Sequence, residues 1–237
     1  MDVDVTEALV YLEKLRKKTG VHLTVTHFVG KAVALAIKEV PSLNGRVLFN
    51  KFVPYPDISI SYLVALEEGK DLGKAKIEAA DEKSLADIGR ELSAMAKRLR
   101  EKKDADYEKS KDALRKLPAV AIRPIVYVTG WLASAVGLSV PALGVTPFPF
   151  GSAIVTSVGQ LGLDEAYVPP TPFCRVPIYV LVGRTADRVV AVDGKPAVRK
   201  MMTLTCTIDH RLLDGSQGGK IASTIRRCFA EPHLVDQ

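Results

Sequence analysis

The chain has 237 residues, of which 47% are hydrophobic and 25% are charged, and its formal net charge is +6. The length allows one large domain with a substantial core, and the composition is typical of a globular protein. No zinc-ligand spacing or aromatic RNA-binding signature accompanies the positive charge, so we expect neither a metal site nor nucleic-acid binding. The acidic N-terminus has no signal-peptide pattern, which predicts a cytoplasmic protein.

Apolar spacing and capping residues predict two helices near the N-terminus. The first helix runs from Thr6 to Lys18, with Thr6 as its N-cap and Gly20 closing it. The second helix begins after Thr24 or Thr26 and ends before Pro41. A third amphipathic helix is expected at 84–102, after strands at 47–52 and 58–66.

The second half of the chain is dominated by predicted strands. Apolar residues alternate there, and Asp193-Gly194 is a strong hairpin turn. Because helices and strands mix without strict alternation, we predict an α+β fold with a mixed β-sheet flanked by helices. The expected elements are strands at 153–158, 178–183, 189–192 and 201–208, then a last helix at 219–229.

An apolar segment from Leu117 to Phe150 interrupts this pattern. No charged residue occurs between Pro124 and Leu163, but glycines and prolines divide the run. About 20 apolar residues suffice for a membrane span, so membrane contact is an alternative. We favour a hairpin packed on its own domain or on a neighbouring subunit. The organisation we expect is therefore one domain over 1–237 with an insertion at about 117–150.

The motif Asp209-His210-Arg211-Leu212-Leu213-Asp214-Gly215 stands near the C-terminus, directly after a predicted strand. A histidine at a strand end can take a proton from a thiol or an alcohol near neutral pH. Asp214 can orient the loop or pair with a cation, and Gly215 lets the backbone turn where a side chain would clash. The motif therefore indicates an active-site histidine.

These residues resemble the signature of the catalytic domain of the dihydrolipoamide acyltransferases of 2-oxo acid dehydrogenase complexes. Chloramphenicol acetyltransferase shares a looser form of the motif. The segment Gly151 to Gly159 is similar to the family's strand Gly-Thr-Phe-Thr-Ile-Ser-Asn-Leu-Gly. The resemblance implies a chloramphenicol acetyltransferase-like fold, acyl transfer between CoA and a dihydrolipoyl thiol, and a homotrimer or larger assembly of trimers with the active site between subunits.

The resemblance also implies roles for individual residues. His210 is the expected general base, Thr156 stands at the family's serine and is the expected oxyanion donor, and Asp214 holds the active-site loop. Ser157, at the family's asparagine, is a second candidate for the oxyanion. Substrate contacts are expected from Ser157, Arg211 and Gly215.

The chain also departs from the family. It shows no lipoyl domain or Pro/Ala-rich linker, so we expect the lipoyl group on another chain, and Gly69 to Ile77 replaces the family strand Gly-Leu-x-x-Pro-Val-Ile. Two alternatives therefore stay open: a core- or cage-forming protein with reduced or no catalysis, and an acyltransferase for another small acceptor. The charged block from Lys97 to Lys116 is interpreted as a solvated helix face rather than a landing surface for an acidic partner.

Overall fold

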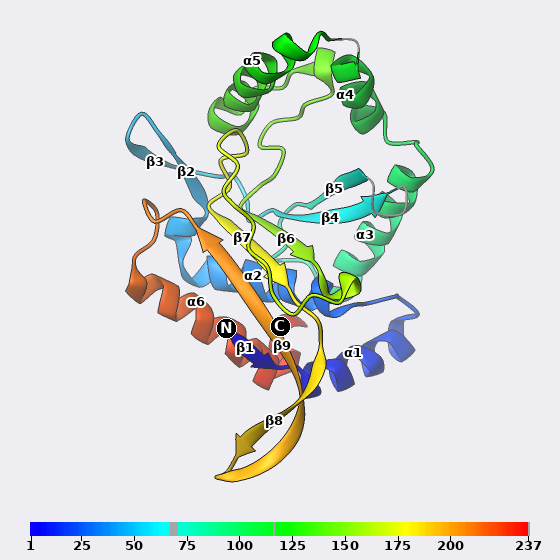
Figure 1. The fold of residues 1–237 in the computed structure, drawn as a ribbon, viewed down its shortest axis with the longest axis vertical. Coiled ribbons are helices and arrows are strands. Elements are labelled where there is room, and N and C mark those ends of the chain that lie inside the picture. Colours follow the sequence, from blue (N-terminus) through cyan, green and yellow to red (C-terminus); the bar gives the residue numbers. More distant parts are fainter. Residues whose placement is uncertain (67–70, 116, 237) are drawn as a thin grey trace.

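A mixed β-sheet organises the protein (Figure 1). The computed structural model describes residues 1–66, 71–115 and 117–236, and within them the sheet has seven strands. Their order is β1-β9-β7-β6-β4-β5, with β8 paired to β9 as a projecting hairpin. Strands β4, β6 and β7 are parallel, whereas β5 and β9 are antiparallel to their neighbours. The strands are β1 (Asp2–Asp4), β4 (Ile60–Leu66), β5 (Asp71–Ile77), β6 (Ala153–Ser157), β7 (Ile178–Val182), β8 (Ala186–Val192) and β9 (Lys195–Ile208).

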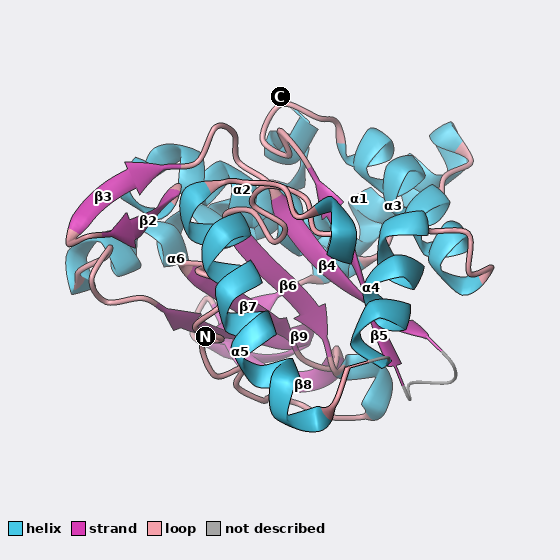
Figure 2. Cartoon of the chain, turned by 90° about the horizontal axis from the view of Figure 1, so that it is seen from above, coloured by secondary structure: helices cyan, strands magenta, loops and turns pink. Residues whose placement is uncertain are grey.

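Four helices cover one face of the sheet and bury the main core against it (Figure 2). They are α1 (Thr6–Thr19), α2 (Val25–Glu39), α3 (Leu85–Arg100) and α6 (Gly215–Ala230). Helix α2 lies at the centre, because apolar side chains surround most of it; Phe28 and Ile37 are fully buried. Helices on a mixed sheet confirm the predicted α+β class. Short 3₁₀ turns occupy Pro41–Leu43, Pro141–Leu143, Gly159–Leu161 and Pro232–Asp236.

The predicted helix ends are confirmed in part. Thr24 caps α2, and Gly20 closes α1 in the left-handed conformation with φ 69°. The prediction that Thr6 caps α1 is wrong, because Thr6 is the first helical residue; its N–H donates to the Asp4 carboxylate instead. Helix α6 begins at Gly215, four residues before the predicted start, since the Asp214 side chain caps it there.

The strand predicted at 47–52 is also wrong. A separate two-stranded hairpin lies there, formed by β2 (Gly45–Leu48) and β3 (Lys51–Pro54). Phe49 and Asn50 both have positive φ, which reverses the chain in two residues. Strand β5 was not predicted; it lies within the segment that replaces a family strand, of which Gly69 and Lys70 fall outside the described residues.

The insertion is helical rather than a hairpin. It contains α4 (Ala105–Arg115), α5 (Ala119–Gly130) and a π-helical turn at Trp131–Val136, and it lies over the sheet face opposite α2 (Figures 1 and 2). Arg46 anchors it, donating from Nε to the Ala135 carbonyl at 2.6 Å. Helix α5 has no fully buried residue, although the turn after it buries Ala133, Ser134 and Ala135.

One segment of the described chain, Ala119–Val136, is long and apolar enough to cross a membrane by length and composition. Only 17% of it is buried. A single segment of this kind does not establish a span, and Arg123 and Pro124 lie within it.

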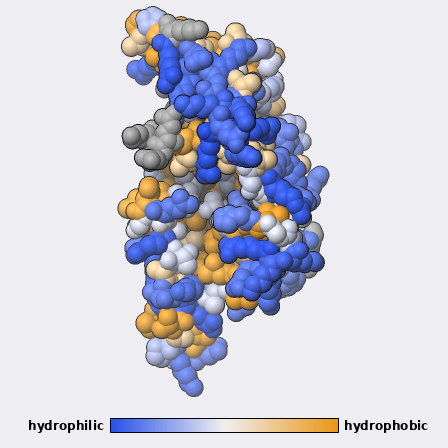
Figure 3. Space-filling view, turned by 90° about the vertical axis from the view of Figure 1, so that its right-hand side faces the viewer, coloured by the Kyte–Doolittle hydropathy of each residue, from blue (hydrophilic) through white to orange (hydrophobic). Residues whose placement is uncertain are grey.

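The charged block from Lys97 to Lys116 lies at the end of α3 and on α4. Figure 3 shows the corresponding face, and its upper part is strongly hydrophilic. Ion pairs tie parts of the block together, among them Lys103 with Glu101 at 2.7 Å and Lys111 with Asp71 at 2.6 Å. The block therefore has the character of a solvated helix surface with local charge pairing.

Candidate active site at the end of strand β9

His210 lies on the turn that joins β9 to α6, and its side chain is exposed. In the part of the chain that the structure describes, no residue forms a hydrogen bond with its imidazole. The ring is therefore presented outward from a fixed turn, free to accept a proton from a molecule that reaches it.

The turn is held by the two residues that flank His210. The Asp209 N–H donates to the Pro177 carbonyl at 2.8 Å, which fixes the turn to the loop before β7. Arg211 donates to both carboxylate oxygens of Asp209, from Nε at 2.9 Å and from Nη2 at 2.5 Å. This pairing lowers the pKa of Asp209 and raises the pKa of Arg211. The Arg211 guanidinium, predicted to contact substrate, is thus engaged within its own turn.

Asp214 caps helix α6. Its carboxylate accepts the Gln217 N–H at 2.8 Å, and the Gln217 side chain in return accepts the Asp214 N–H at 3.0 Å. A capping box of this kind satisfies the free donors of a first helical turn. Gly215 is the first residue of that helix, and a Cβ at this position would meet nothing within 4 Å. The expectation that a side chain would clash at Gly215 is therefore wrong.

Thr156 and Ser157 lie next to each other on β6 and therefore point to opposite faces of the sheet. Val155 shares its face with Ser157 and packs into the core against the helices. Ile154 shares its face with Thr156 and packs in a smaller apolar cluster with Leu63. The two candidates for the oxyanion thus serve different sides of the sheet, and only Thr156 is on the side of the insertion.

Within one chain, His210 and Thr156 lie far apart. The register places Thr156 beside Leu181, and Leu181 beside Thr205, so two strand spacings of about 4.8 Å separate Thr156 from β9. Three residues of β9 then run from Thr205 to Ile208, adding roughly 10 Å in the perpendicular direction. His210 follows beyond that end. Since a general base must come within hydrogen-bond reach of the reacting proton, one copy of this chain does not join the two residues.

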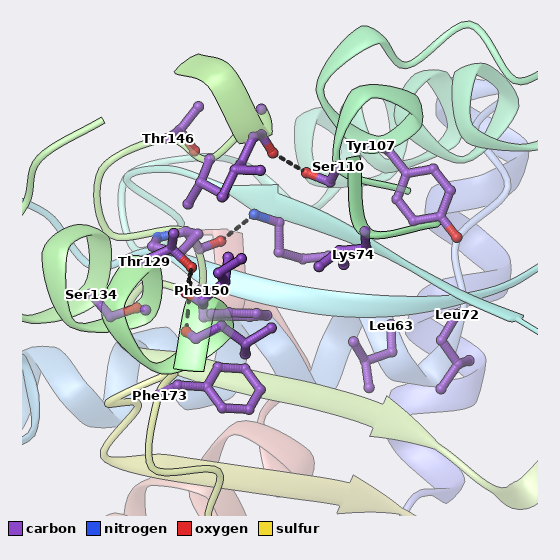
Figure 4. Close-up of a pocket in the computed structure, with 18 residues that line it drawn as sticks. Leu63, Leu72, Lys74, Tyr107, Ser110, Thr129, Ser134, Thr146, Phe150 and Phe173 are labelled. Carbon is purple, nitrogen blue, oxygen red and sulfur yellow. Dashed lines mark hydrogen bonds between the residues drawn. The ribbon is translucent and has the colours of Figure 1, made fainter. Parts of the chain in front are cut away.

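A buried cation was missed by the sequence reasoning. Lys74 on β5 points under the insertion, where a cavity of about 360 Å³ lies between the sheet and helices α4 and α5 (Figure 4). Burial lowers the pKa of Lys74 to about 8. The available signal was the alternation of Lys74 and Lys76 with Gly73, Ala75 and Ile77, which marks a strand with one apolar face.

A metal centre is not indicated in the residues that the structure describes, where no group of three or more His, Cys, Asp or Glu side chains could hold an ion. The chemistry of the site therefore depends on a base, hydroxyl donors and apolar surface.

The chain resembles acyltransferases of one family over most of its length. A family model described as "2-oxoacid dehydrogenases acyltransferase (catalytic domain)" matches residues 1–111 and 151–235. The unmatched stretch between them covers the insertion. The chain is 29% identical over 232 residues to the lipoamide acyltransferase component of the branched-chain alpha-keto acid dehydrogenase complex of Bacillus subtilis (strain 168), covering 96% of this chain and 45% of that protein. It thus spans less than half the length of that relative.

Solved structures share the fold. A probable dihydrolipoamide acetyltransferase from Listeria monocytogenes 4b F2365 has a TM-score of 0.72 at 27% identity, covering 98% of this chain and 82% of the other. The cubic core of a pyruvate dehydrogenase multienzyme complex has a TM-score of 0.71 at 19% identity, covering 99% and 81%. A chloramphenicol acetyltransferase has a TM-score of 0.52 at 12% identity, covering 96% and 85%. The predicted chloramphenicol acetyltransferase-like fold is therefore confirmed.

Proposed function

Because the chain belongs to the family of 2-oxoacid dehydrogenase acyltransferase catalytic domains, we propose that it moves an acyl group between CoA and a dihydrolipoyl thiol. Acyl-CoA is a substrate, and the lipoyl group comes from another chain. The observation that carries the proposal is the outward-facing His210 on a turn clamped by Asp209, Arg211 and the α6 cap. A rigid, accessible base is what acyl transfer between thiols requires.

The reaction needs one proton shuttle and one oxyanion donor. His210 takes the proton of the attacking thiol, and the sulfur attacks the carbonyl carbon of the thioester. The Thr156 hydroxyl donates to the oxygen of the tetrahedral intermediate. The intermediate then collapses, the first thiolate leaves, and the His210 imidazolium returns the proton to it.

The separation of His210 from Thr156 within one chain supports an active site between subunits. A second copy that brings its His210 to the Thr156 strand would supply the missing partner. The relative named as part of a dehydrogenase complex and the neighbour named as a cubic core support an assembly. We therefore propose a homotrimer, or a larger assembly of trimers, with sites shared between neighbours.

Subunit complementation tests both parts of the proposal. His210→Ala and Thr156→Val are each expected to lower acyl transfer from acetyl-CoA or isobutyryl-CoA to free dihydrolipoamide by 10²-fold or more. When the two variants are co-expressed in equal amounts, mixed trimers contain interfaces with an intact His210 and an intact Thr156. Random mixing should restore about a quarter of the wild-type rate.

The controls separate the possible failures. Thr156→Ser should keep activity because the hydroxyl remains, and His233→Ala changes an exposed histidine outside the site. Complementation without recovery, from variants that are inactive alone, would place both residues in one chain's site and refute the shared site. Wild-type protein that assembles but releases no CoA would leave the core-forming alternative.

A further inference from the structure

We propose that the cavity between the insertion and the sheet is a binding site for an apolar chain that ends in a carboxylate. It lies outside the part of the chain that the family model matches on the insertion side, since residues 112–150 form its roof. The proposal does not depend on acyl transfer.

The walls of the cavity are largely apolar. Leu63 and Leu72 form the sheet side, Phe150 and Phe173 close one end, and Ile125 and Val145 come from the insertion. Its volume of about 360 Å³ is within the range of small-molecule sites. Figure 4 shows these elements surrounding an open centre, with Lys74 reaching in from its strand. An aliphatic or aromatic group would replace water against these surfaces.

One positive charge enters this apolar space. The Lys74 ammonium donates to the Pro149 carbonyl at 2.5 Å and lies 5.2 Å from the centre of the Phe150 ring. Among the residues that the structure describes, no carboxylate forms an ion pair with it. Asp104 and Asp106, at the start of α4, act on it only through space. A cation held in this way favours an anionic group on whatever fills the cavity.

A second polar group also lacks a partner. The Ser134 hydroxyl lines the cavity and is buried, yet it has no hydrogen-bond partner among the described residues. The other hydroxyls of the lining are satisfied: Ser110 donates to the Leu143 carbonyl, and Thr129 donates to the Ile125 carbonyl. Ser134 is thus available to a ligand or to a water that accompanies it.

The cavity also lies next to the proposed acyl-transfer residue. Leu63 pairs with Lys74 across β4 and β5, and the parallel register of β4 with β6 continues to place Leu63 beside Thr156. The three side chains share one face of the sheet, roughly 5 Å from one to the next. A ligand in the cavity would therefore lie one strand away from Thr156.

Calorimetric titration with sodium octanoate and with 1-octanol tests the inference. Wild-type protein should bind both compounds, and octanoate more tightly. Lys74→Met should weaken octanoate binding on the order of 10- to 100-fold while leaving octanol binding unchanged, because only the charge-assisted contact is lost. Retained octanol binding also reports that the cavity of the variant is folded.

Lys76→Met is the matched control. Lys76 lies on the same strand and face as Lys74 but does not line the cavity, and it pairs with Glu78 at 2.8 Å. It should bind octanoate as the wild type does. The inference is overturned by any of three results: no octanoate binding to the wild type, equal weakening of octanoate and octanol by Lys74→Met, or equal effects of the two lysine substitutions.

Discussion

At the scale of single residues, the site and the cavity each depend on a side chain whose surroundings the sequence does not reveal. His210 is exposed because Asp209 and Arg211 satisfy each other on either side of it. Lys74 is the reverse case, a charge held under an apolar roof. Such an arrangement costs stability, and proteins commonly accept that cost at binding sites.

The pKa of Lys74, lowered to about 8 by burial, leads to a stability prediction. In the unfolded chain a lysine titrates near about 10.4, so between these values the unfolded state binds more protons and stability rises with pH. Below about pH 8 the charged lysine carries its full cost. We expect Lys74→Met to raise the free energy of unfolding at pH 7 by up to about 3 kcal/mol, a difference that disappears by about pH 10.4.

Urea unfolding of both proteins at the two pH values measures this difference. The neighbouring groups that act on Lys74 are Lys76, Cys174, Asp104 and Asp106, so Lys76→Met serves as the comparison at both pH values. A Lys74→Met protein less stable than the wild type at pH 7 would show that the ammonium contributes favourably through its bond to Pro149.

At the scale of elements, helix α6 begins where the motif ends. Asp214 caps it, so the end of the proposed active-site turn is also the first turn of a helix that packs on α2. The motif's aspartate therefore has a clear structural task, which is to fix the helix start four residues after His210.

Removing the cap should destabilise the protein. We expect Asp214→Ala to lower the free energy of unfolding by about 1 kcal/mol, because the Gln217 N–H loses its acceptor. Asp214→Asn keeps an acceptor oxygen and should lose much less. Thermal unfolding of the three proteins provides the measurement, and equal losses for alanine and asparagine would contradict the capping role.

Helix α5 is the element with the least cover. Its exposed side chains include Val120, Tyr127 and Val128, and Trp131 directly follows it with 40% of its surface exposed. Such a surface is usually covered by protein or by lipid. The earlier expectation that the insertion packs on protein rather than entering a bilayer stays a prediction.

Trp131 is the only tryptophan, so its fluorescence reports on this segment alone. We expect the emission of the assembled protein to be unchanged by liposomes, because a protein neighbour covers the helix. Trp131→Phe supplies the blank. A spectral shift together with flotation on liposomes would instead establish membrane docking by Ala119–Val136.

At the scale of the whole molecule, exposed apolar side chains gather on segments that a single chain leaves uncovered. Leu161 and Tyr167 lie on the loop after β6, and Val189 and Val198 pair across the projecting β8–β9 hairpin. Large exposed apolar side chains on loops and arms of this kind are typical of subunit contacts.

Light scattering should therefore give the mass of a trimer, about 77 kDa for three chains of 25.7 kDa, or a multiple of it. We expect Leu161→Asp to lower this mass, because a carboxylate would be buried without a partner. A monomer at working concentration would refute the assembly, and with it the shared active site.

The sequence by itself determined the elements whose information is local. Alternating apolar residues identified strands β4, β6, β7 and β9, and the residues Asp193-Gly194 identified the hairpin turn, with positive φ at both. Helix α3 was predicted with its inward leucines because they recur at helical spacing. The motif around His210 was readable for the same reason, since its residues lie within one turn.

Only the tertiary structure decided what depends on contacts between distant segments. It placed Lys74 under residues that follow it by more than fifty positions, it put Thr156 and Ser157 on opposite faces, and it separated His210 from Thr156. It also showed that Phe49 and Asn50 reverse the chain, and that the insertion is helical. Register, burial and unpaired charge arise from packing between segments, and local periodicity carries no record of which segments meet.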